Sequence, residues 1–495
     1  MRNHRFHFRF YLAAMLVAAG AAQPRTAEPR AAPAAPPPHP ATYRDLQYPP
    51  INDIKVPAPV RFELPNGLVV YLIEDHELPL VGVHAAIRAG GRWDPAAKAG
   101  LASITGMVMR TGGSTARSGD RLDDELDRLG ASIETDIGQD EGSVSASMLK
   151  EDLGRGIDII ADLLQHPAFP QDKIDLAKIQ WRDAIARRND EPNGMVFREF
   201  ARILYGSDSP YVAQAEYATI DAITRDDLVA FHQRFFQPEN MILGVVGDFN
   251  TAEVRAQIER ALGAWPRGGQ PRPAVPVVDA AARNHGGIYE IVKTDMQQSW
   301  VLMGMLGGRR DDPDYYALQV MNEVLGGGFS SRLFSNVRSA QGLAYAVFSS
   351  WNADWDHAGT FLAGGSSKPE TTLKIYHAML AEVRRMAEGG ATEDELARAK
   401  DSILKGFAFE FDQTHKIIER LMTYEYFGYP KDYLQQYHAR ISEVTRGDVA
   451  RVGRKYLTPE KFAVLFGGNG HYEAPLTSLG PVQAVDIAIP PPKQP

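Results

Sequence analysis

Residues 224–227, Thr-Arg-Asp-Asp, open a pattern that the chain uses twice. Pro238 follows 14 residues after the threonine and Gly247 follows nine residues after the proline. The same landmarks return 221 residues later, as Thr-Arg-Gly-Asp at 445–448, Pro459 and Gly468. Two other pairs of segments recur in the same order at offsets of 217 and 222 residues, 90–95 with 307–313 and 172–178 with 394–400. Copies this long indicate two homologous domains, because the units of a solenoid span about 20–50 residues.

The composition is that of a globular protein. The chain has 495 residues, too many for one core, with 44% hydrophobic and 23% charged residues. Its formal net charge of -9 and the absence of a basic run exclude nucleic acid as the main partner. Without any cysteine, the chain forms no disulfide and has no thiol nucleophile.

The N-terminus has the pattern of an export signal. Arginines at positions 2, 5 and 9 precede an apolar core at 11–22, with small residues at 19–21 for cleavage. This core is shorter than the roughly 20 apolar residues that span a bilayer. We therefore expect a periplasmic or secreted protein with no membrane attachment after signal cleavage. An uncleaved signal that anchors the chain is the alternative.

Proline-rich stretches and the repeat define the domain boundaries. We expect a loose C-terminal tail and an interdomain linker around the prolines at 266–276. The predicted order is a signal peptide (1–22), an Ala/Pro-rich tether (23–52), the first domain (53–265), the linker (266–284), the second domain (285–473) and the tail (474–495).

Apolar periodicity in the first copy predicts the fold class. Apolar runs predict strands at 67–73, 80–87 and 241–246. Apolar residues at helical spacing predict helices near 101–108, 122–129 and 152–164, with Gly130 as a C-cap. Hairpin strands with helices between them indicate an α+β fold, in which helices cover one face of a mainly antiparallel sheet in each domain.

Two segments carry a resemblance to a known family. Residues 99–113 read Ala-Gly-Leu-Ala-Ser-Ile-Thr-Gly-Met-Val-Met-Arg-Thr-Gly-Gly, and residues 326–334 read Gly-Gly-Gly-Phe-Ser-Ser-Arg-Leu-Phe, followed by Gly-Leu-Ala-Tyr at 342–345. The first resembles the zinc helix of peptidase family M16, the pitrilysin/insulinase metallopeptidases, and the second resembles its substrate-binding Arg/Tyr segment. The resemblance extends over residues 55–472. It implies two homologous α/β-roll domains that face each other across a clamshell or a subunit interface.

The zinc motif is degenerate. The family helix carries His-x-x-Glu-His, and this frame places Ser103 and Met107 at the histidines and Gly106 at the glutamate. The family's third ligand, a glutamate, falls near Ala184. None of these four residues is a zinc ligand or a general base. We therefore expect no zinc on this chain.

Two other groups contain residue types that bind metal ions. They are Asp354, Asp356 and His357, and the pair His415 and Glu419 at i, i+4. A polar loop and a solvated helix face, respectively, explain these patterns better than a metal site.

The Arg/Tyr segment is complete. In the family, an arginine and a tyrosine at the spacing of Arg338 and Tyr345 bind the main chain of the peptide substrate and help stabilise its tetrahedral intermediate. The resemblance assigns both roles here, and we expect Gly326, Gly327 and Gly328 to let the backbone approach the bound peptide. A helix over 330–339 would bury its apolar residues, namely Leu333, Phe334 and Val337. The structural alternative is that Arg338 caps this helix and Tyr345 fills a sheet.

Some bacterial members of the family are heterodimers in which one subunit carries the zinc motif and the other the Arg/Tyr pair. This sequence resembles the second kind, so the resemblance implies a zinc-bearing paralogue as partner, zinc in that partner and a peptide substrate. The alternative is a catalytically inactive scaffold or peptide-binding protein. Retention of Arg338 and Tyr345 favours the first hypothesis.

Overall fold

The computed structural model describes residues 59–411 and 413–492, which belong to one compact unit, Asp53–Pro495. The predicted signal peptide and tether lie outside the described residues. No helix in the described part of the chain is both long and apolar enough to cross a bilayer.

The first copy folds around a six-stranded sheet with the order β1-β2-β6-β3-β5-β4. Strands β2 and β6 pair in parallel, and all other neighbours are antiparallel. The bounds are β1 Val60–Glu63, β2 Val69–Glu74, β3 Leu80–Ile87, β4 Ser132–Ile137, β5 Gly142–Leu149 and β6 Met241–Gly247. The three strands expected from the apolar runs are β2, β3 and β6.

The second copy repeats this order in five of its strands, but its edge strand comes from the C-terminal end of the chain and runs parallel to its neighbour. Its sheet has the order β12-β7-β11-β8-β10-β9, with β7 parallel to β11 and β12. The bounds are β7 Gly287–Val292, β8 Ser299–Leu306, β9 Ala346–Asn352, β10 Thr360–Ser367, β11 Ala463–Gly468 and β12 Val482–Ala484. The fold class is confirmed: two α+β domains, each with a mixed sheet in which antiparallel pairs predominate.

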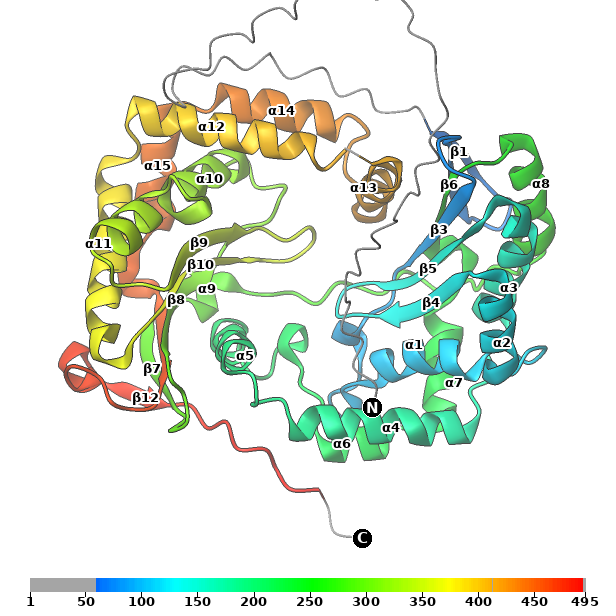
Figure 1. Cartoon of the computed structure of the whole chain (residues 1–495), viewed down its shortest axis with the longest axis horizontal. Coiled ribbons are helices and arrows are strands. Elements are labelled where there is room, and N and C mark those ends of the chain that lie inside the picture. The colour runs from blue at the N-terminus through cyan, green and yellow to red at the C-terminus, as the bar shows by residue number, and fades with distance from the viewer. Residues whose placement is uncertain (1–58, 412, 493–495) are drawn as a thin grey trace, which may run out of the picture. The chain divides into compact units, whose positions relative to one another are not determined.

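Fifteen α-helices connect these strands in the described part of the chain (Figure 1). In the first copy they are α1 Leu101–Gly112, α2 Gly119–Leu129, α3 Leu153–Gln165, α4 Gln171–Ala186, α5 Pro192–Tyr205, α6 Tyr217–Ala222, α7 Arg225–Phe235 and α8 Thr251–Leu262. From the linker onward they are α9 Ala280–Arg283, α10 Tyr315–Asn322, α11 Thr372–Gly389, α12 Glu393–Ala408, α13 Thr414–Phe427, α14 Tyr433–Glu443 and α15 Arg446–Tyr456.

The repeated Thr-Arg-x-Asp pattern is a pair of helix N-caps. The hydroxyl of Thr224 accepts a hydrogen bond from the backbone of Asp227, whose carboxylate accepts one from the backbone of Thr224. Thr445 and Asp448 form the same capping box at the start of α15. Such a cap satisfies backbone donors that the first helical turn leaves free. The repeat in sequence is therefore a repeat in structure.

One helix of each copy packs on the sheet of the other copy. Ile418 and Met422 of α13 pack on β6 of the first sheet, where a Cβ atom on Gly244 would lie 2.4 Å from the Met422 sulfur. Val196 of α5 packs in the same way on β11 of the second sheet, where a Cβ atom on Gly467 would lie 2.6 Å from Val196 Cγ2. A glycine under each helix therefore allows the close approach, and the two helices tie the copies together (Figure 1).

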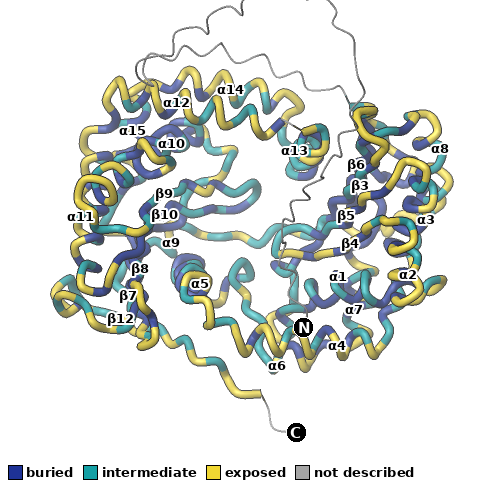
Figure 2. Tube along the Cα trace, in the orientation of Figure 1, coloured by how far each residue is buried: buried dark blue, intermediate teal, exposed yellow. Residues whose placement is uncertain are grey.

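Burial follows this arrangement. The strands of both sheets and the inner faces of the helices around them are the most buried parts of the chain (Figure 2). Separate apolar clusters form on the two faces of each sheet, one under the copy's own helices and one under the borrowed helix.

The prediction of a loose tail is wrong. Strand β12 lies within the tail and pairs in parallel with β7, and the next residue, Val485, donates its backbone N–H to the carbonyl of Glu290 at 2.8 Å. Asn189 of the first copy then donates to the carbonyl of Ile487 at 2.7 Å, and Ile489 packs against the first copy's core. The alternating apolar residues of 482–489 indicate a packed, strand-like segment. The prediction of a loose tail missed this pattern because the end of the chain is rich in proline.

Ending the chain after Gly480 should lower its thermal stability, because β12 and the apolar contacts of Ile487 and Ile489 are lost. Each kcal/mol removed lowers the midpoint by about 2–4 °C in a domain of this size. Ending the chain after Pro490 keeps all of these contacts and is the matched control. Equal midpoints for the two truncated chains, measured by circular dichroism, would contradict the role given to the tail.

Candidate functional site

Helix α1 is the element on which the resemblance places the zinc ligands. It starts after Gly100, and the carboxylate of Asp94 accepts hydrogen bonds from the backbone of Gly100 at 3.0 Å and of Ala102 at 3.1 Å. Burial raises the pKa of Asp94 to about 7, although these bonds oppose the rise. The helix lies against β4, where the hydroxyl of Thr135 donates to the carbonyl of Gly106 at 2.6 Å. This side of α1 is therefore fixed to the sheet.

The three motif positions on α1 are occupied by packing contacts. Ser103 donates its hydroxyl to the carbonyl of Ile137 at 3.2 Å, and Met107 packs half-buried against the apolar core. A Cβ atom on Gly106 would lie only 2.7 Å from the backbone nitrogen of Ile137, so no carboxylate side chain fits there. The fourth position, Ala184, is exposed on α4.

Zinc therefore does not fit this site. A hydroxyl, a thioether and two residues without donor atoms do not make a zinc ligand set. Within residues 59–411 and 413–492, no group of three or more His, Asp or Glu residues is placed to hold a metal ion.

Replacing Gly106 with alanine should destabilise the protein, because the new methyl group overlaps the backbone of β4. Such overpacking costs about 1–3 kcal/mol. Gly194 is also helical, but nothing lies within 4 Å of a Cβ atom there. Gly194→Ala should therefore leave stability unchanged or raise it by up to about 1 kcal/mol. Thermal midpoints check this, and a Gly106→Ala variant as stable as Gly194→Ala would show that the contact relaxes.

The Arg/Tyr segment lies in the second copy between α10 and β9. It contains two helical turns of the π type, at Glu323–Gly327 and Leu333–Ala340, where one helix over 330–339 is predicted. Leu333 and Val337 are buried as expected, whereas Phe334 is only half-buried. The Phe334 ring instead supports the guanidinium of Arg338, 4.7 Å from the ring centroid.

Buried polar contacts hold this segment in place. Arg332 forms two hydrogen bonds of 2.8 Å to the carboxylate of Glu395 and a third, of 2.7 Å, to the carbonyl of Gly390. Asn336 donates to the carboxylate of Glu382 at 2.9 Å. Fork-to-fork pairing of arginine and carboxylate is geometrically specific. The segment is therefore fixed against α11 and α12 from beneath.

Arg338 and Tyr345 project from this anchored segment into solvent. Tyr345 is 51% exposed and directly precedes β9. Neither the phenol nor the Arg338 guanidinium forms a hydrogen bond or ion pair with any residue that the structure describes. The Arg338 side chain makes no capping bond to its helix, and Tyr345 lies at the end of the sheet, where its backbone N–H donates to the carbonyl of Ser366 at 2.8 Å while much of the residue stays exposed. Both groups present free donors at the surface.

The glycines of the segment differ from one another. Gly326 is buried, and a Cβ atom there would lie 2.3 Å from the backbone nitrogen of Ser349 in β9. Gly327 and Gly328 are more exposed and lie beside the carboxylate of Glu323. The close packing of β9 therefore explains why position 326 is a glycine. The approach of a peptide to Gly327 and Gly328 stays a prediction.

Glu395 should stabilise the protein in a pH-dependent way. Its hydrogen bond to Arg332, opposed by burial, lowers the pKa of Glu395 to about 2. A lowered pKa contributes stability that is fully present above the ordinary glutamate pKa and is lost as the pH falls toward 2. Glu395→Gln keeps the capping geometry and removes the charge, so it should cost about 1–3 kcal/mol at pH 7 and progressively less below about pH 4.5.

Thermal midpoints between pH 2.5 and pH 7 measure this difference. Asp401→Asn, which removes an exposed carboxylate from the same helix α12, is the control. A Glu395→Gln deficit that does not shrink with acidity would show that the ion pair is not its source.

The residues of the first alternative metal group, Asp354, Asp356 and His357, form ion pairs. Arg92 of the first copy, which is buried, donates one hydrogen bond of 3.0 Å to the carboxylate of Asp356 and makes a further ion-pair contact with it at 3.0 Å. His357 lies 2.9 Å from Asp356 and 3.3 Å from Asp354, and its ring stacks on Tyr211 at 3.9 Å. Burial raises the pKa of Asp356, but its bonds to His357 and Arg92 leave it below the ordinary value. The group joins the two copies.

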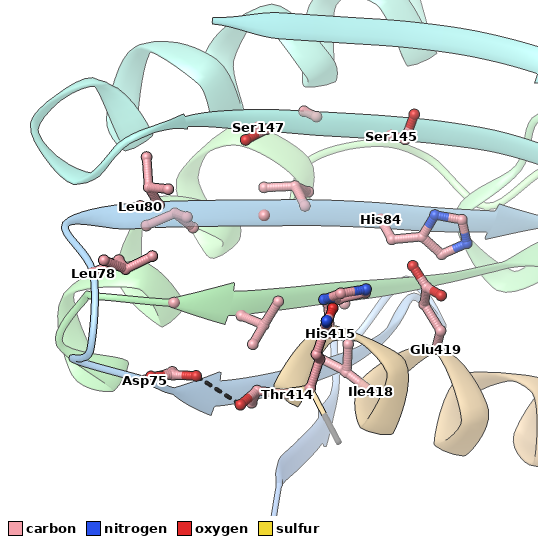
Figure 3. Close-up of a pocket in the computed structure, with 18 of the residues that line it drawn as sticks. Asp75, Leu78, Leu80, His84, Ser145, Ser147, Thr414, His415, Ile418 and Glu419 are labelled. Atoms are coloured by element: carbon pink, nitrogen blue, oxygen red, sulfur yellow. Dashed lines mark hydrogen bonds between the residues drawn. The ribbon is translucent and has the colours of Figure 1, made fainter. Parts of the chain in front are cut away.

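The second alternative group lines a pocket of about 550 Å³ between α13 and the first sheet (Figure 3). Figure 3 shows His84 of β3 and Glu419 of α13 pointing toward each other, and Thr414 bonded to Asp75 at 2.6 Å. Burial lowers the pKa of His84, and the negative charge of Glu419 acts in the opposite direction. His415 lies on the same helix face as Glu419.

Sequence reasoning missed most of the contacts that position these residues. The partners of Arg332 and Arg92 lie 63 and 264 residues away, at Glu395 and Asp356. No local spacing signals such pairs. The arginines themselves are visible in the sequence, because Arg332 belongs to the Ser-Arg-Leu-Phe frame and Arg92 to the repeated Gly-Gly-Arg segment.

Two family profiles match the chain. The profile described as insulinase (peptidase family M16) matches residues 69–209, and the one described as peptidase M16 inactive domain matches residues 222–403. The first match lies within the first copy, and the second begins at the end of the first copy and continues through most of the second.

Individual proteins show the same likeness. An uncharacterized zinc protease of Mycobacterium leprae is 28% identical over 420 residues, which is 82% of this chain and 91% of the relative. The crystal structure of a peptidase M16 inactive domain from Pseudomonas fluorescens aligns with a TM-score of 0.76 at 23% identity, over 85% of this chain and 100% of that one. A protease from Helicobacter pylori aligns with a TM-score of 0.74 at 19% identity, over 83% of this chain and 100% of that one.

Proposed function

Because the chain belongs to the peptidase M16 family, we propose that it is the non-zinc subunit of a heterodimeric M16 metallopeptidase. A zinc-bearing paralogue is its partner, and a peptide is the substrate. The basic, then apolar N-terminus supports a periplasmic location for this complex.

One observation carries the proposal: Arg338 and Tyr345 are exposed, and neither side chain forms a hydrogen bond or ion pair with a described residue, on a segment that is otherwise firmly anchored. Arginine and tyrosine side chains that are buried in a fold are normally hydrogen-bonded within it, whereas these two keep their donors in solvent. Donors fixed in position and left open to solvent are suited to a ligand that brings acceptors. The carbonyl oxygens of an extended peptide are such acceptors.

The chemistry of the pair follows from its donors. A guanidinium carries five N–H groups in a rigid fork, and a phenol adds one O–H group. Before reaction these donors hold and orient the peptide main chain. When its carbonyl gains negative charge, the same bonds become stronger, which lowers the barrier. The chain thus supplies binding and charge stabilisation.

This chain does not supply the metal. Position 106 lacks the space for the family's glutamate, and positions 103 and 107 are committed to contacts with β4 and the core. The family's metal chemistry therefore belongs to the partner. A scaffold without any catalytic role is the competing function, and Arg338 and Tyr345 decide between the two.

Mixing this chain with its zinc-bearing paralogue should produce peptidase activity that neither has alone. Tyr345→Phe keeps the ring and removes one donor, so it should lower kcat by roughly 10²–10³-fold. Arg338→Ala should also raise KM, because a charge-assisted hydrogen bond to substrate is lost. Tyr217→Phe, at a half-buried tyrosine of α6, is the matched control and should leave both constants unchanged.

Gel filtration of each variant complex separates assembly from catalysis, and elemental analysis should find no stoichiometric zinc on the isolated chain. The triple change Ser103→His, Gly106→Glu and Met107→His should not create activity in it. A reconstituted complex that cleaves peptides equally well without Arg338 and Tyr345 would favour the scaffold. One tightly held zinc per isolated chain would refute the proposal.

A further inference from the structure

A second pocket, of about 290 Å³, lies within the second copy among α10, α12, α13 and α14. It is apart from the Arg/Tyr segment and from the pocket of Figure 3. Its walls are aromatic and come from five elements. The rings are Tyr315, Trp355, Phe407, Tyr424, Tyr433 and Tyr437.

Arg310 enters this pocket without a counter-ion. Its guanidinium lies 4.1 Å from the centroid of the Trp355 ring and donates to the hydroxyl of Tyr315 at 3.2 Å. Its Nε is buried without a hydrogen-bond partner, and no described carboxylate forms an ion pair with it. The preceding Arg309 pairs with Asp311. A half-buried arginine is costly unless an anion accompanies it, so this site lacks a negative partner.

Tyr433 presents a second unsatisfied donor. Its side chain is 5% exposed, its hydroxyl has no hydrogen-bond partner, and it lines the same pocket. The phenol of Tyr316 is close enough for Tyr433 to affect its pKa, but no hydrogen bond in good geometry joins the two. Buried hydroxyls in folded proteins are normally bonded. A ligand that brings an acceptor would satisfy this one.

A second guanidinium adds to the positive charge. Arg420 of α13 lines the pocket and pairs with Glu410. Arg310 and Arg420 both lower the pKa of Tyr315 and of Tyr424, against the larger effect of burial, so the two cations face the same rings. Two guanidinium groups against one carboxylate leave the pocket with a net positive charge.

We propose that this pocket binds a small carboxylate that carries an aromatic ring. The carboxylate pairs with Arg310 and accepts a hydrogen bond from Tyr433, while the ring packs against the aromatic side chains of the pocket wall. The volume lies just below the usual range for ligand pockets, about 300–1,000 Å³, which favours a small ligand with one ring. The ligand is either a free aromatic acid or the C-terminal aromatic residue of a peptide.

Titration of the full mature chain with 3-phenylpropionate, followed by calorimetry and by tryptophan fluorescence, tests the proposal. The neutral 3-phenylpropionamide and the ring-less propionate should each bind at least about tenfold more weakly, since a charge-assisted bond or the ring contacts are missing. Arg310→Met should weaken binding of the acid by a similar factor. Arg309→Met, at the exposed and paired neighbour, is the matched control.

Tyr433→Phe keeps the ring and should weaken binding by a few-fold, which gives a second measure if Arg310→Met does not fold. A tetrapeptide that ends in phenylalanine, with a free or an amidated C-terminus, distinguishes the sources. Binding of the free-acid peptide identifies a peptide C-terminus, and binding of 3-phenylpropionate alone identifies a free acid. Equal affinity for acid and amide, no binding of either, or full affinity in Tyr433→Phe together with a folded Arg310→Met would overturn the proposal.

Discussion

Each sheet of this protein is covered on one face by a helix that belongs to the other copy, and the remaining architecture depends on this exchange. The contact is apolar at its centre, where Met422 of α13 rests on Gly244. At its edge it is polar, since Glu425 accepts bonds from Arg61 at 2.6 Å and from Tyr71 at 2.6 Å. Removing either helix would expose an apolar sheet face, so the two copies fold as one unit.

The two copies have similar folds, but they differ in how tightly the segments that match the family's motifs are packed. In the first, α1 is drawn against β4 so closely that Gly106 has no room for a side chain, and the family's metal chemistry is excluded by packing. In the second, Arg332 and Asn336 secure a segment from beneath, which leaves Arg338 and Tyr345 open. The proposed role, a subunit that completes a partner's site, rests on this contrast between tight packing in one copy and free donors in the other.

Local patterns in the sequence predicted the parts of this structure that local physics determines. Helix α1 and the central strands follow from apolar spacing within a few residues. The capping boxes at Thr224 and Thr445 are equally local, although the prediction from sequence recognised them only as a repeated pattern. The exchange of α5 and α13 could not be predicted, because an apolar helix face does not specify which sheet it covers. The same holds for the ion pairs of Arg92 and Arg332, whose partners are distant in sequence. Exposure of Arg338 and Tyr345 likewise required the tertiary structure.

The helix exchange also limits how such a chain can be divided or built up in evolution. Either copy made by itself would carry one helix with no sheet to cover and one bare sheet, with Gly244 or Gly467 at its centre. A single copy could remedy this only by pairing with another of its kind through a two-fold axis, each giving its helix to the other. Joining two such copies in one chain removes the dependence on concentration. It also frees each half to diverge, so that one could lose a catalytic motif while the other kept its substrate contacts.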